Sequence, residues 1–360
     1  MWPDYRVADL FRVEHPILLA PMAGAMNFEL AVAVAEGGGL GSLPCAMLTP
    51  AAVYEQAAQF RVKTGRPLNL NFFCHTPPVP SNTREVAWRE RLKQYYDELA
   101  IDPAKPIPSS SRAPFNDEFC RAVEQIRPAI VSFHFGLPET SLLARVRAAG
   151  CLVISSATTV REARWLEERG VDAVIAQGVE AGGHRGMFLT EDLASQSGTF
   201  ALLPQVVDAV KVPVIAGGAI TDARGIAAAF ALGAAGVQIG SAYLHCPESK
   251  ISAPHRAALG NLSDDGTVLT NVMSGRPARG IVNRLIREVG PISSLAPEFP
   301  LAAGALAPLR EAAEGAGSGD FSPLWAGQAA GLGRAMPAKA LTRALAADAQ
   351  ELMRKLGAQR

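Results

Sequence analysis

Short runs of apolar residues recur along the chain, separated by stretches in which apolar residues return every three or four positions. Nearly all of these runs are continuous rather than alternating with polar residues. Continuous runs are typical of parallel strands that are buried on both faces. The pattern therefore predicts eight parallel strands, at residues 17–20, 39–43, 68–72, 130–133, 152–155, 173–176, 214–216 and 237–239.

The stretches between these strands predict helices with defined ends. Thr159 and Glu162 are spaced as a capping box, in which each side chain caps a backbone amide of the other residue, and Gly170 ends that helix. Strands that alternate with helices over about 240 residues are typical of an α/β fold of the (β/α)₈ class. We therefore expect a TIM barrel with a helical cap segment inserted after strand eight.

The same pattern divides the chain into three parts. Residues 1–245 are expected to form the barrel, with a long excursion at residues 74–115 between the third and fourth strands. Residues 246–335 lose the strand rhythm, which predicts helices and loops that cover one end of the barrel. Residues 336–360 contain a predicted helix that is expected to return to the barrel wall.

The charge composition argues against two classes of binding partner, nucleic acids and anionic membranes. The 360 residues include 34 Lys and Arg against 34 Asp and Glu, so the formal net charge is zero. Nucleic-acid and anionic-membrane surfaces select proteins with a basic excess, so we expect neither partner. The N-terminal segment lacks the apolar run of a secretory signal. The five cysteines show no zinc or redox spacing, which favours reduced thiols, a cytoplasmic protein and no metal site.

The reactive groups of such barrels lie at the carboxyl ends of the strands. Gly217 and Gly218 follow the seventh predicted strand, and Gly240 and Ser241 follow the eighth. Loops at these two positions commonly bind phosphate through backbone amides, and glycine lets the backbone approach the oxygens. The sequence thus predicts a phosphate site there, the alternative being that the glycines only turn tight corners.

Four polar side chains stand at the ends of other strands. Asn71 and Gln177 suit the edge of a flat heteroaromatic ring such as a flavin, although capping of a barrel loop is equally open. His184 lies among glycines that allow a ligand to approach, so it is the candidate base, acid or anion partner. His134 contacts the ligand if it faces inward and is a core histidine if it faces outward.

Several segments of the chain resemble the nitronate monooxygenases, formerly called 2-nitropropane dioxygenases, and most closely their bacterial class I group. The resemblance spans nearly the whole chain and is most specific in the Gly-Gly-His loop and in Asn-x-Asn-x-Phe. The segments that carry it are Ala-Pro-Met at 20–22, Asn-Leu-Asn-Phe-Phe-Cys-His at 69–75, Ser-Phe-His-Phe-Gly at 132–136, Glu-Ala-Gly-Gly-His-Arg-Gly at 180–186, Gln-Ile-Gly-Ser at 238–241 and Ser-Gly-Arg-Pro-Ala-Arg at 274–279.

The resemblance implies a TIM barrel that holds one FMN and oxidises alkyl nitronates with O₂ to a carbonyl compound and nitrite. Propionate 3-nitronate is the toxic substrate associated with the group, which makes detoxification the expected role. By position, the resemblance makes His184 catalytic. It also assigns FMN contacts to Met22, Asn71, Gln177, Gly182, Gly218, Gln238, Ile239, Gly240 and Ser241. The turn after the seventh strand departs from the family pattern, so the phosphate contact falls on either Gly217 or Gly218.

Two arginines of the 274–279 segment are further candidates. Arg276 or Arg279 can hold a substrate carboxylate bidentately, the alternative being a structural salt bridge. Other functions also stay open. One is an FMN-dependent NAD(P)H:quinone or enoyl-acyl-carrier-protein reductase on the same barrel. Another is a non-catalytic barrel that binds a flavin or a phosphate ligand.

Overall fold

Eight parallel strands form a barrel at the centre of the protein, whose computed structural model describes residues 1–102 and 112–358. Neighbouring strands pair in the order β1-β9-β8-β6-β5-β4-β3-β2. The barrel closes between β1 and β2, where Leu40 N donates to Ile17 O over 2.9 Å. The predicted TIM barrel is confirmed. Its strands are β1 (Ile17–Leu19), β2 (Gly41–Pro44), β3 (Leu68–Phe73), β4 (Ile130–His134), β5 (Leu152–Ala157), β6 (Ala173–Gln177), β8 (Val214–Gly217) and β9 (Gly236–Ile239).

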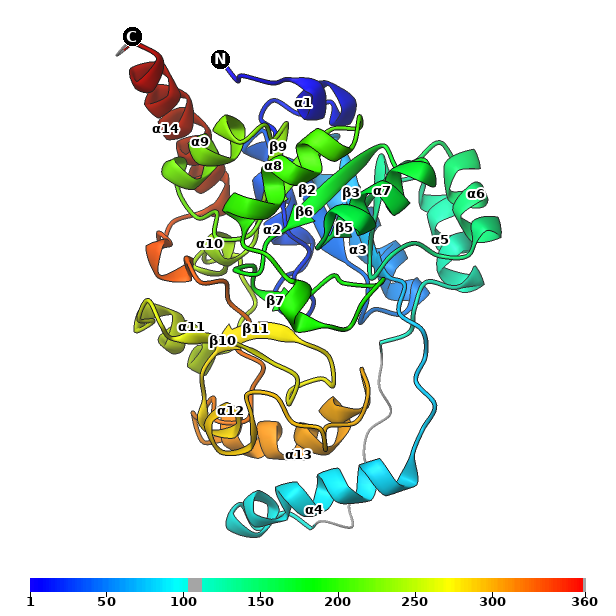
Figure 1. Cartoon of the computed structure of the whole chain (residues 1–360), viewed down its shortest axis with the longest axis vertical. Coiled ribbons are helices and arrows are strands. Elements are labelled where there is room, and N and C mark those ends of the chain that lie inside the picture. Colours follow the sequence, from blue (N-terminus) through cyan, green and yellow to red (C-terminus); the bar gives the residue numbers. More distant parts are fainter. Residues whose placement is uncertain (103–111, 359–360) are drawn as a thin grey trace.

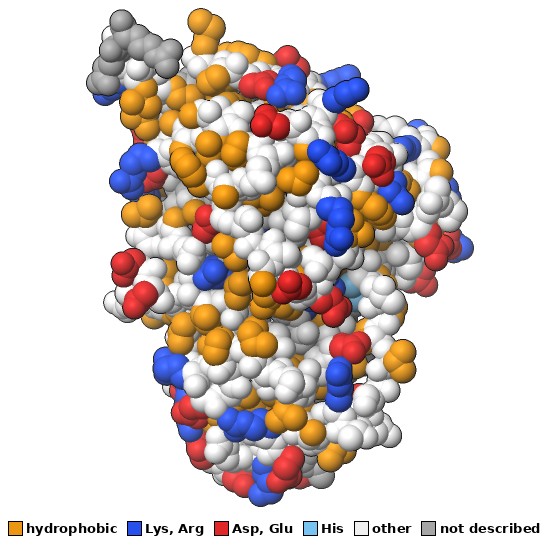
Figure 2. Space-filling view, viewed as in Figure 1, with side chains coloured by type: hydrophobic (Ala, Val, Ile, Leu, Met, Phe, Trp, Pro, Cys, Tyr) orange, Lys and Arg blue, Asp and Glu red, His pale blue; other side chains and the backbone are white. Residues whose placement is uncertain are grey.

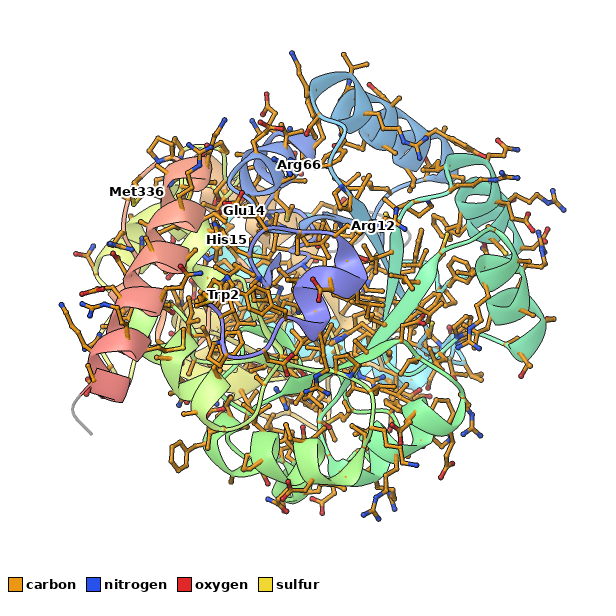
Figure 3. All side chains as sticks on the ribbon, turned by 90° about the horizontal axis from the view of Figure 1, so that it is seen from above. Trp2, Arg12, Glu14, His15, Arg66 and Met336 are labelled. Carbon is orange, nitrogen blue, oxygen red and sulfur yellow. The ribbon has the colours of Figure 1, made fainter. Side chains whose placement is uncertain are left out.

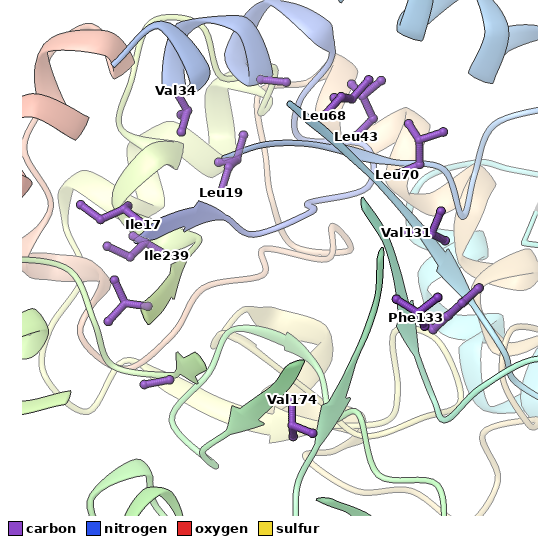
Figure 4. Close-up of a cluster of buried hydrophobic side chains, with 14 of the residues drawn as sticks. Ile17, Leu19, Val34, Leu43, Leu68, Leu70, Val131, Phe133, Val174 and Ile239 are labelled. Atoms are coloured by element: carbon purple, nitrogen blue, oxygen red, sulfur yellow. The ribbon is translucent and has the colours of Figure 1, made fainter. Parts of the chain in front are cut away.

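Helices surround the barrel and bury their apolar faces against the outer faces of the strands (Figure 1). Figure 4 shows part of this core, where Val34 of a helix lies near Leu19 of β1. The helices are α2 (Phe28–Glu36), α3 (Pro50–Lys63), α5 (Asp117–Ile126), α6 (Thr140–Ala148), α7 (Val160–Glu168), α8 (Thr199–Ala209), α9 (Ala223–Ala231) and α14 (Ala338–Ala358). The last of these, α14, packs against α9 and α2.

The capping box predicted at α7 is only half correct. Thr159 accepts a hydrogen bond from Glu162 N over 3.2 Å, as expected. The Glu162 carboxylate, however, accepts from the backbone N and the hydroxyl of Thr158, both at 2.7 Å. Its other oxygen accepts from the backbone N–H groups of Phe188 and Leu189. A fully buried carboxylate thus ties α7 to a distant loop.

The amino ends of the strands are covered by helix α1 (Arg6–Phe11), which lies across that end of the barrel (Figure 3). Val7 and Phe11 of α1 pack into the same buried cluster as Leu18, Ile154 and residues of other strands. Because this end is filled by side chains, access to the barrel interior is left to the carboxyl ends of the strands.

The segment after β9 covers those carboxyl ends and lies below the barrel in Figure 1. Its helices are α10 (Ser241–Leu244), α11 (Ala253–Gly260), α12 (Arg284–Val289) and α13 (Ala302–Gly315), and it also contains the 3₁₀ turn η2 (Ala330–Leu332). A second 3₁₀ turn, η1 (Leu193–Ser195), lies earlier in the chain, between β7 and α8. It also contains strands, which the expectation of helices and loops alone missed. β10 (Thr267–Thr270), β11 (Ala278–Ile281) and the two-residue β7 (Gly183–His184) form an antiparallel sheet.

The excursion between β3 and β4 contributes to this cap rather than to the barrel wall. Its helix α4 (Asn82–Glu98) packs against α13, and the two share a hydrophobic cluster separate from the barrel core. Trp88 is buried in that cluster and donates from Nε1 to Ala302 O over 3.1 Å. The cap is thus assembled from two segments that are far apart in the sequence. The expectations for residues 103–111 lie outside the described residues.

The surface carries side chains of both charges, and the cysteines are unpaired. Lys and Arg side chains are interspersed with Asp and Glu over the face shown in Figure 2. The five cysteines are free, and all but the half-buried Cys74 are buried. Within the part of the chain that is described, no helix combines the length and the apolar character needed to cross a membrane.

Candidate active site

A cavity of about 470 Å³ lies between the carboxyl ends of the barrel strands and the cap. Its size falls within the range typical of small-molecule and cofactor sites. Most of the predicted site residues line it, namely Met22, Asn71, His134, Gln177, Gly182, His184, Gly217, Gly218, Gln238, Gly240 and Ser241. Ile239, Arg276 and Arg279 are not part of the lining. Among the described residues, no cluster of His, Cys, Asp and Glu is suited to hold a metal ion.

One side of the cavity is built mainly from backbone. The loops that follow β6, β8 and β9 meet there with residues 326–327 of the cap. Ser241 accepts a hydrogen bond from Gly327 N over 2.9 Å. Gly182 packs so closely against this cap segment that an added Cβ would lie 2.6 Å from the backbone of Ala326. Gly218 has φ +128°, a conformation that favours glycine. Both Gly217 and Gly218 line the cavity.

The three carboxamides in the lining have different surroundings. Both ends of Gln177 are used by the loop after β6, since Nε2 donates to His184 O at 3.0 Å and Oε1 accepts from Gly186 N at 2.7 Å. Asn71 donates to the hydroxyl of Ser132 over 2.9 Å. The side chain of Gln238 makes no hydrogen bond with the described protein residues, although it lines the cavity. Gln177 therefore supports the loop, whereas the Gln238 amide is available to a ligand.

The loop that carries His184 is fixed in place despite its glycines. Residues 183 and 184 pair with β11 as a short strand. Arg185 is fully buried and donates to the carbonyl oxygens of Gly178 and Gln177 at 2.6 and 2.8 Å. The His184 ring itself is held by Ser274, whose hydroxyl lies 2.9 Å from Nε2. The imidazole is thus positioned before any ligand arrives.

Three histidines gather at this part of the cavity, and burial keeps each of them neutral. Burial lowers the pKa of His184 well below its usual range, and the nearby positive charge of Arg112 lowers it further. Burial also lowers the pKa of His134 to about 3 and that of His75 to about 4. His134 faces inward, with Nδ1 2.6 Å from the Ser156 hydroxyl and Nε2 3.2 Å from His184 O. Its neutral ring therefore donates from Nε2 and accepts at Nδ1.

Aromatic rings surround His184 on several sides. The centroids of Phe299 and Trp325 lie 5.1 and 5.4 Å from its ring, and those of Phe73 and Phe135 lie 6.2 and 6.1 Å away. Phe299 and Trp325 belong to the cap, and the sequence reading did not single them out, because they occupy loops without a strand or helix pattern. These rings cover part of the imidazole, which is half-buried and faces the cavity.

The structure does not support a substrate role for the two arginines predicted in the 274–279 segment. Arg279 donates to Val179 O over 3.0 Å and to Thr267 O over 3.3 Å, so its guanidinium is used by the backbone. Arg276 lies over the ring of Phe135 at 4.1 Å and donates to Met187 O. Both side chains therefore hold the cap against the loop after β6.

The residues of the cavity fit a flavin. The glycine loops leave bare backbone in the cavity lining, and a Cβ at Gly240 would lie 3.2 Å from the side chain of Ala20. Gln238 offers both a donor and an acceptor to a heteroaromatic edge. Glu180 caps the N-terminus of α8 by accepting from Thr199 N at 2.8 Å, so that helix end does not need an external anion.

The fold and a cavity built at the carboxyl ends of its strands define a TIM-barrel enzyme. The chain belongs to the nitronate monooxygenase family, whose model matches residues 5–348. It is therefore a flavin-dependent oxidoreductase, as the resemblance predicted.

Individual relatives agree with this assignment. The chain is 40% identical to a nitronate monooxygenase of Pseudomonas aeruginosa over 345 residues, covering 94% of this chain and 97% of that protein. It is 37% identical to a nitronate monooxygenase of Paraburkholderia phytofirmans, covering 96% and 95%. Among solved structures, the nitroalkane oxidase of Streptomyces ansochromogenes superimposes with a TM-score of 0.89 at 39% identity, covering 98% and 99%. FabK of Thermotoga maritima gives a TM-score of 0.76 at 29% identity, covering 99% of each chain.

Proposed function

We propose that the protein is an FMN-dependent nitronate monooxygenase that oxidises alkyl nitronates, with propionate 3-nitronate as its substrate, to a carbonyl compound and nitrite with O₂. The observation that carries the proposal is the neutral, prepositioned imidazole of His184 in the cavity wall. The family membership and the similarity to the Streptomyces nitroalkane oxidase support the same reaction class.

Several residues are placed to hold FMN in this proposal. Gly182, Gly218, Gly240 and Ser241 would receive the phosphate through their backbone, and Gln238 would contact the ring. Met22 and Asn71 line the same space, whereas Ile239 does not and is withdrawn as a contact. When bound, FMN supplies an electron acceptor that passes electrons from the nitronate to O₂.

His184 would position the nitro group of the substrate. Because the ring is neutral, it offers a hydrogen-bond donor or acceptor without the competing demand for a counter-ion. The aromatic rings around it make the surroundings less polar, which strengthens each hydrogen bond made to a nitronate oxygen. The same neutral imidazole is able to accept the α-proton when a nitroalkane binds in its uncharged form.

The test is the His184→Asn variant. We expect nitrite release from propionate 3-nitronate under air to fall about 100- to 1,000-fold, the range for a lost acid–base or orienting group. Bound FMN, measured by absorbance, should stay unchanged. His15→Asn is the control, because His15 lies at the opposite end of the barrel (Figure 3). Unchanged nitrite release by His184→Asn would remove the histidine from the mechanism.

Because the structure is similar to FabK, a flavin-dependent reductase is the competing function. Rapid NAD(P)H oxidation with a quinone or an enoyl thioester, together with no nitrite from any nitronate, would replace the proposal. An FMN-loaded protein that neither nitronate nor NAD(P)H reduces would instead favour the non-catalytic barrel.

A further inference from the structure

The first residue of the 274–279 segment contacts the candidate catalytic histidine directly. Ser274 is buried, and its hydroxyl lies 2.9 Å from Nε2 of His184. The same hydroxyl donates to the backbone carbonyl of Arg276 over 3.3 Å. His184 lines the cavity and Ser274 does not, so the Nε2 edge of the imidazole is turned away from the space that a ligand would occupy.

Backbone contacts hold Ser274 in place beside the imidazole. The next residue, Gly275, has φ +90°, and an added Cβ there would lie 2.1 Å from the carbonyl oxygen of Pro297, so only glycine fits. Three residues further along, Ala278 of β11 pairs with His184 of β7 in the antiparallel sheet. The serine and the histidine are therefore fixed relative to each other by the fold of the cap.

The directions of the hydrogen bonds around Ser274 decide the tautomer of His184. A serine hydroxyl has one proton to donate, whereas a carbonyl oxygen can only accept. If the hydroxyl donated to His184, the Arg276 carbonyl would face an oxygen lone pair at 3.3 Å and would lose this donor. With the hydroxyl proton directed at the Arg276 carbonyl, the hydroxyl accepts from Nε2–H of His184 instead, and all three groups are satisfied.

His134 provides a comparison within the same site. Its Nε2 donates to the backbone carbonyl of His184 over 3.2 Å, so its Nδ1 accepts from the Ser156 hydroxyl over 2.6 Å. There the carbonyl is bound by the histidine, and the serine is the donor of the pair. At His184 the carbonyl is bound by the serine, and the histidine is the donor of the pair.

The other ring nitrogen of His184 is the one left for a ligand. Burial keeps the pKa of His184 low, so the imidazole is neutral and carries a single N–H. With that proton on Nε2, Nδ1 has a free lone pair. Nδ1 makes no hydrogen bond with the described residues, and its ring lines the cavity.

We propose that Ser274 is a positioning residue that fixes His184 in the Nε2–H form and so presents a bare Nδ1 to the cavity as a proton acceptor. The inference rests on the proposed function and takes it further, from a histidine that can donate or accept to one whose cavity-facing nitrogen is set to accept. A nitronate has already lost its acidic proton, whereas a neutral nitroalkane still carries one on its α-carbon. Ser274 therefore matters most for substrates in the neutral form.

The proton transfer balances without a further reagent. The α-C–H bond breaks, its electron pair stays on the carbon and spreads over the nitro group, and the proton goes to Nδ1. The ring then carries two N–H groups and a positive charge. Its Nε2–H stays bonded to the Ser274 hydroxyl, whose own proton stays on the Arg276 carbonyl. A hydrogen bond that already exists thus stabilises the charge that develops on the ring.

The first test determines the tautomer in the FMN-loaded protein. The chain has six histidines, so labelling them with nitrogen-15 gives a small set of ring signals in NMR spectra, and the His184→Asn variant assigns those of His184. We expect the proton on Nε2 and a bare Nδ1 in the wild-type protein, and a substantial population of the Nδ1–H form in Ser274→Ala. A proton on Nδ1 in the wild-type protein, or an unchanged tautomer in Ser274→Ala, would overturn the proposal.

The second test compares nitroethane with ethyl nitronate, which share a carbon skeleton and differ by the α-proton. In Ser274→Ala we expect kcat/KM for nitroethane to fall about 10- to 100-fold, mostly through kcat, which is the usual cost of losing a hydrogen bond to a charged group. For ethyl nitronate the change should stay below about threefold, because no proton has to be removed. Ser274→Thr keeps a hydroxyl and should recover part of the loss.

Ser263→Ala is the matched control, because the Ser263 hydroxyl bonds to Asp265 on the exposed surface and the variant should leave both substrates unchanged. Equal losses for the two substrates in Ser274→Ala, or a wild-type enzyme that does not oxidise nitroethane, would overturn the role of Ser274. If the wild-type enzyme released no nitrite from ethyl nitronate or propionate 3-nitronate, the proposed function would fail, while the NMR measurement would still decide the tautomer.

Discussion

The two sides of the cavity are built from different materials. The side formed by the loops after β6, β8 and β9 presents glycine backbone and a few polar side chains, held at the ends of barrel strands. The other side presents His184, Trp325, Arg112 and Arg310, which come from segments far apart in the sequence. Backbone positions tolerate little change, whereas side chains on loops can be exchanged one at a time. The first side suits a bound cofactor, and the second suits a substrate.

This contrast predicts that a methyl group added to the backbone side of the cavity weakens the binding of the cofactor. In Gly182→Ala the new Cβ would lie 2.6 Å from backbone atoms of Ala326 and Gly327. The cap segment would have to move, and with it the bond from Gly327 N to Ser241. We expect FMN to bind about tenfold to a hundredfold more weakly, as judged by fluorescence titration of the apoprotein.

The control for this change is Gly260→Ala in α11, where an added Cβ meets no atom within 4 Å. That variant should bind FMN as tightly as wild type. Wild-type affinity in Gly182→Ala would mean that the glycine loops are not the fixed side of the cavity.

One buried carboxylate ties helix α7 to the segment that follows the His184 loop. Glu162 accepts from two backbone N–H groups just beyond the His184 loop, at Phe188 and Leu189, and also from Thr158. Glu162→Gln would place an N–H₂ donor where only acceptors fit, at a cost of about 2–4 kcal/mol in the free energy of unfolding. Urea denaturation measures this, with Glu168→Gln on the exposed face of α7 as control. An equal, small effect in both variants would show that the loop is held by other contacts.

The contrast between the two sides also explains what the sequence alone could predict. The strands were found because each is a buried apolar run. The glycine loops were found because they stand at the ends of such runs, and His184 because it lies in the loop that follows β6. Arg112 was not predicted to line the cavity, because it follows a Pro- and Ser-rich stretch that offers no helix or strand to place it. The substrate role of Arg276 and Arg279 was predicted from their segment, but only folding shows which groups receive a guanidinium. The error at Glu162 arose because Thr158 and Thr159 give the same local signal.

The side-chain half of the cavity should also make the protein sensitive to acid, because His134 in its lining and the nearby His75 are held without charge. Burial lowers the pKa of both groups below the value of 6.5 expected in the unfolded chain. Between pH 6.5 and about 4 the unfolded state therefore binds protons that the native state does not, and stability falls as the pH falls. Each such histidine contributes up to about 1.4 kcal/mol per pH unit. Carboxylates with lowered pKa values act mainly below this window.

Removing one of these histidines should flatten that dependence. In His134→Asn, the slope of unfolding free energy against pH between 6 and 5 should decrease by as much as one proton's contribution, even though the variant is less stable at pH 7.5 after losing its bond to His184 O. Urea midpoints at several pH values give the slope directly. A slope identical to wild type would mean that His134 takes up its proton in the native state, and the cavity wall would then carry charge where burial argues for none.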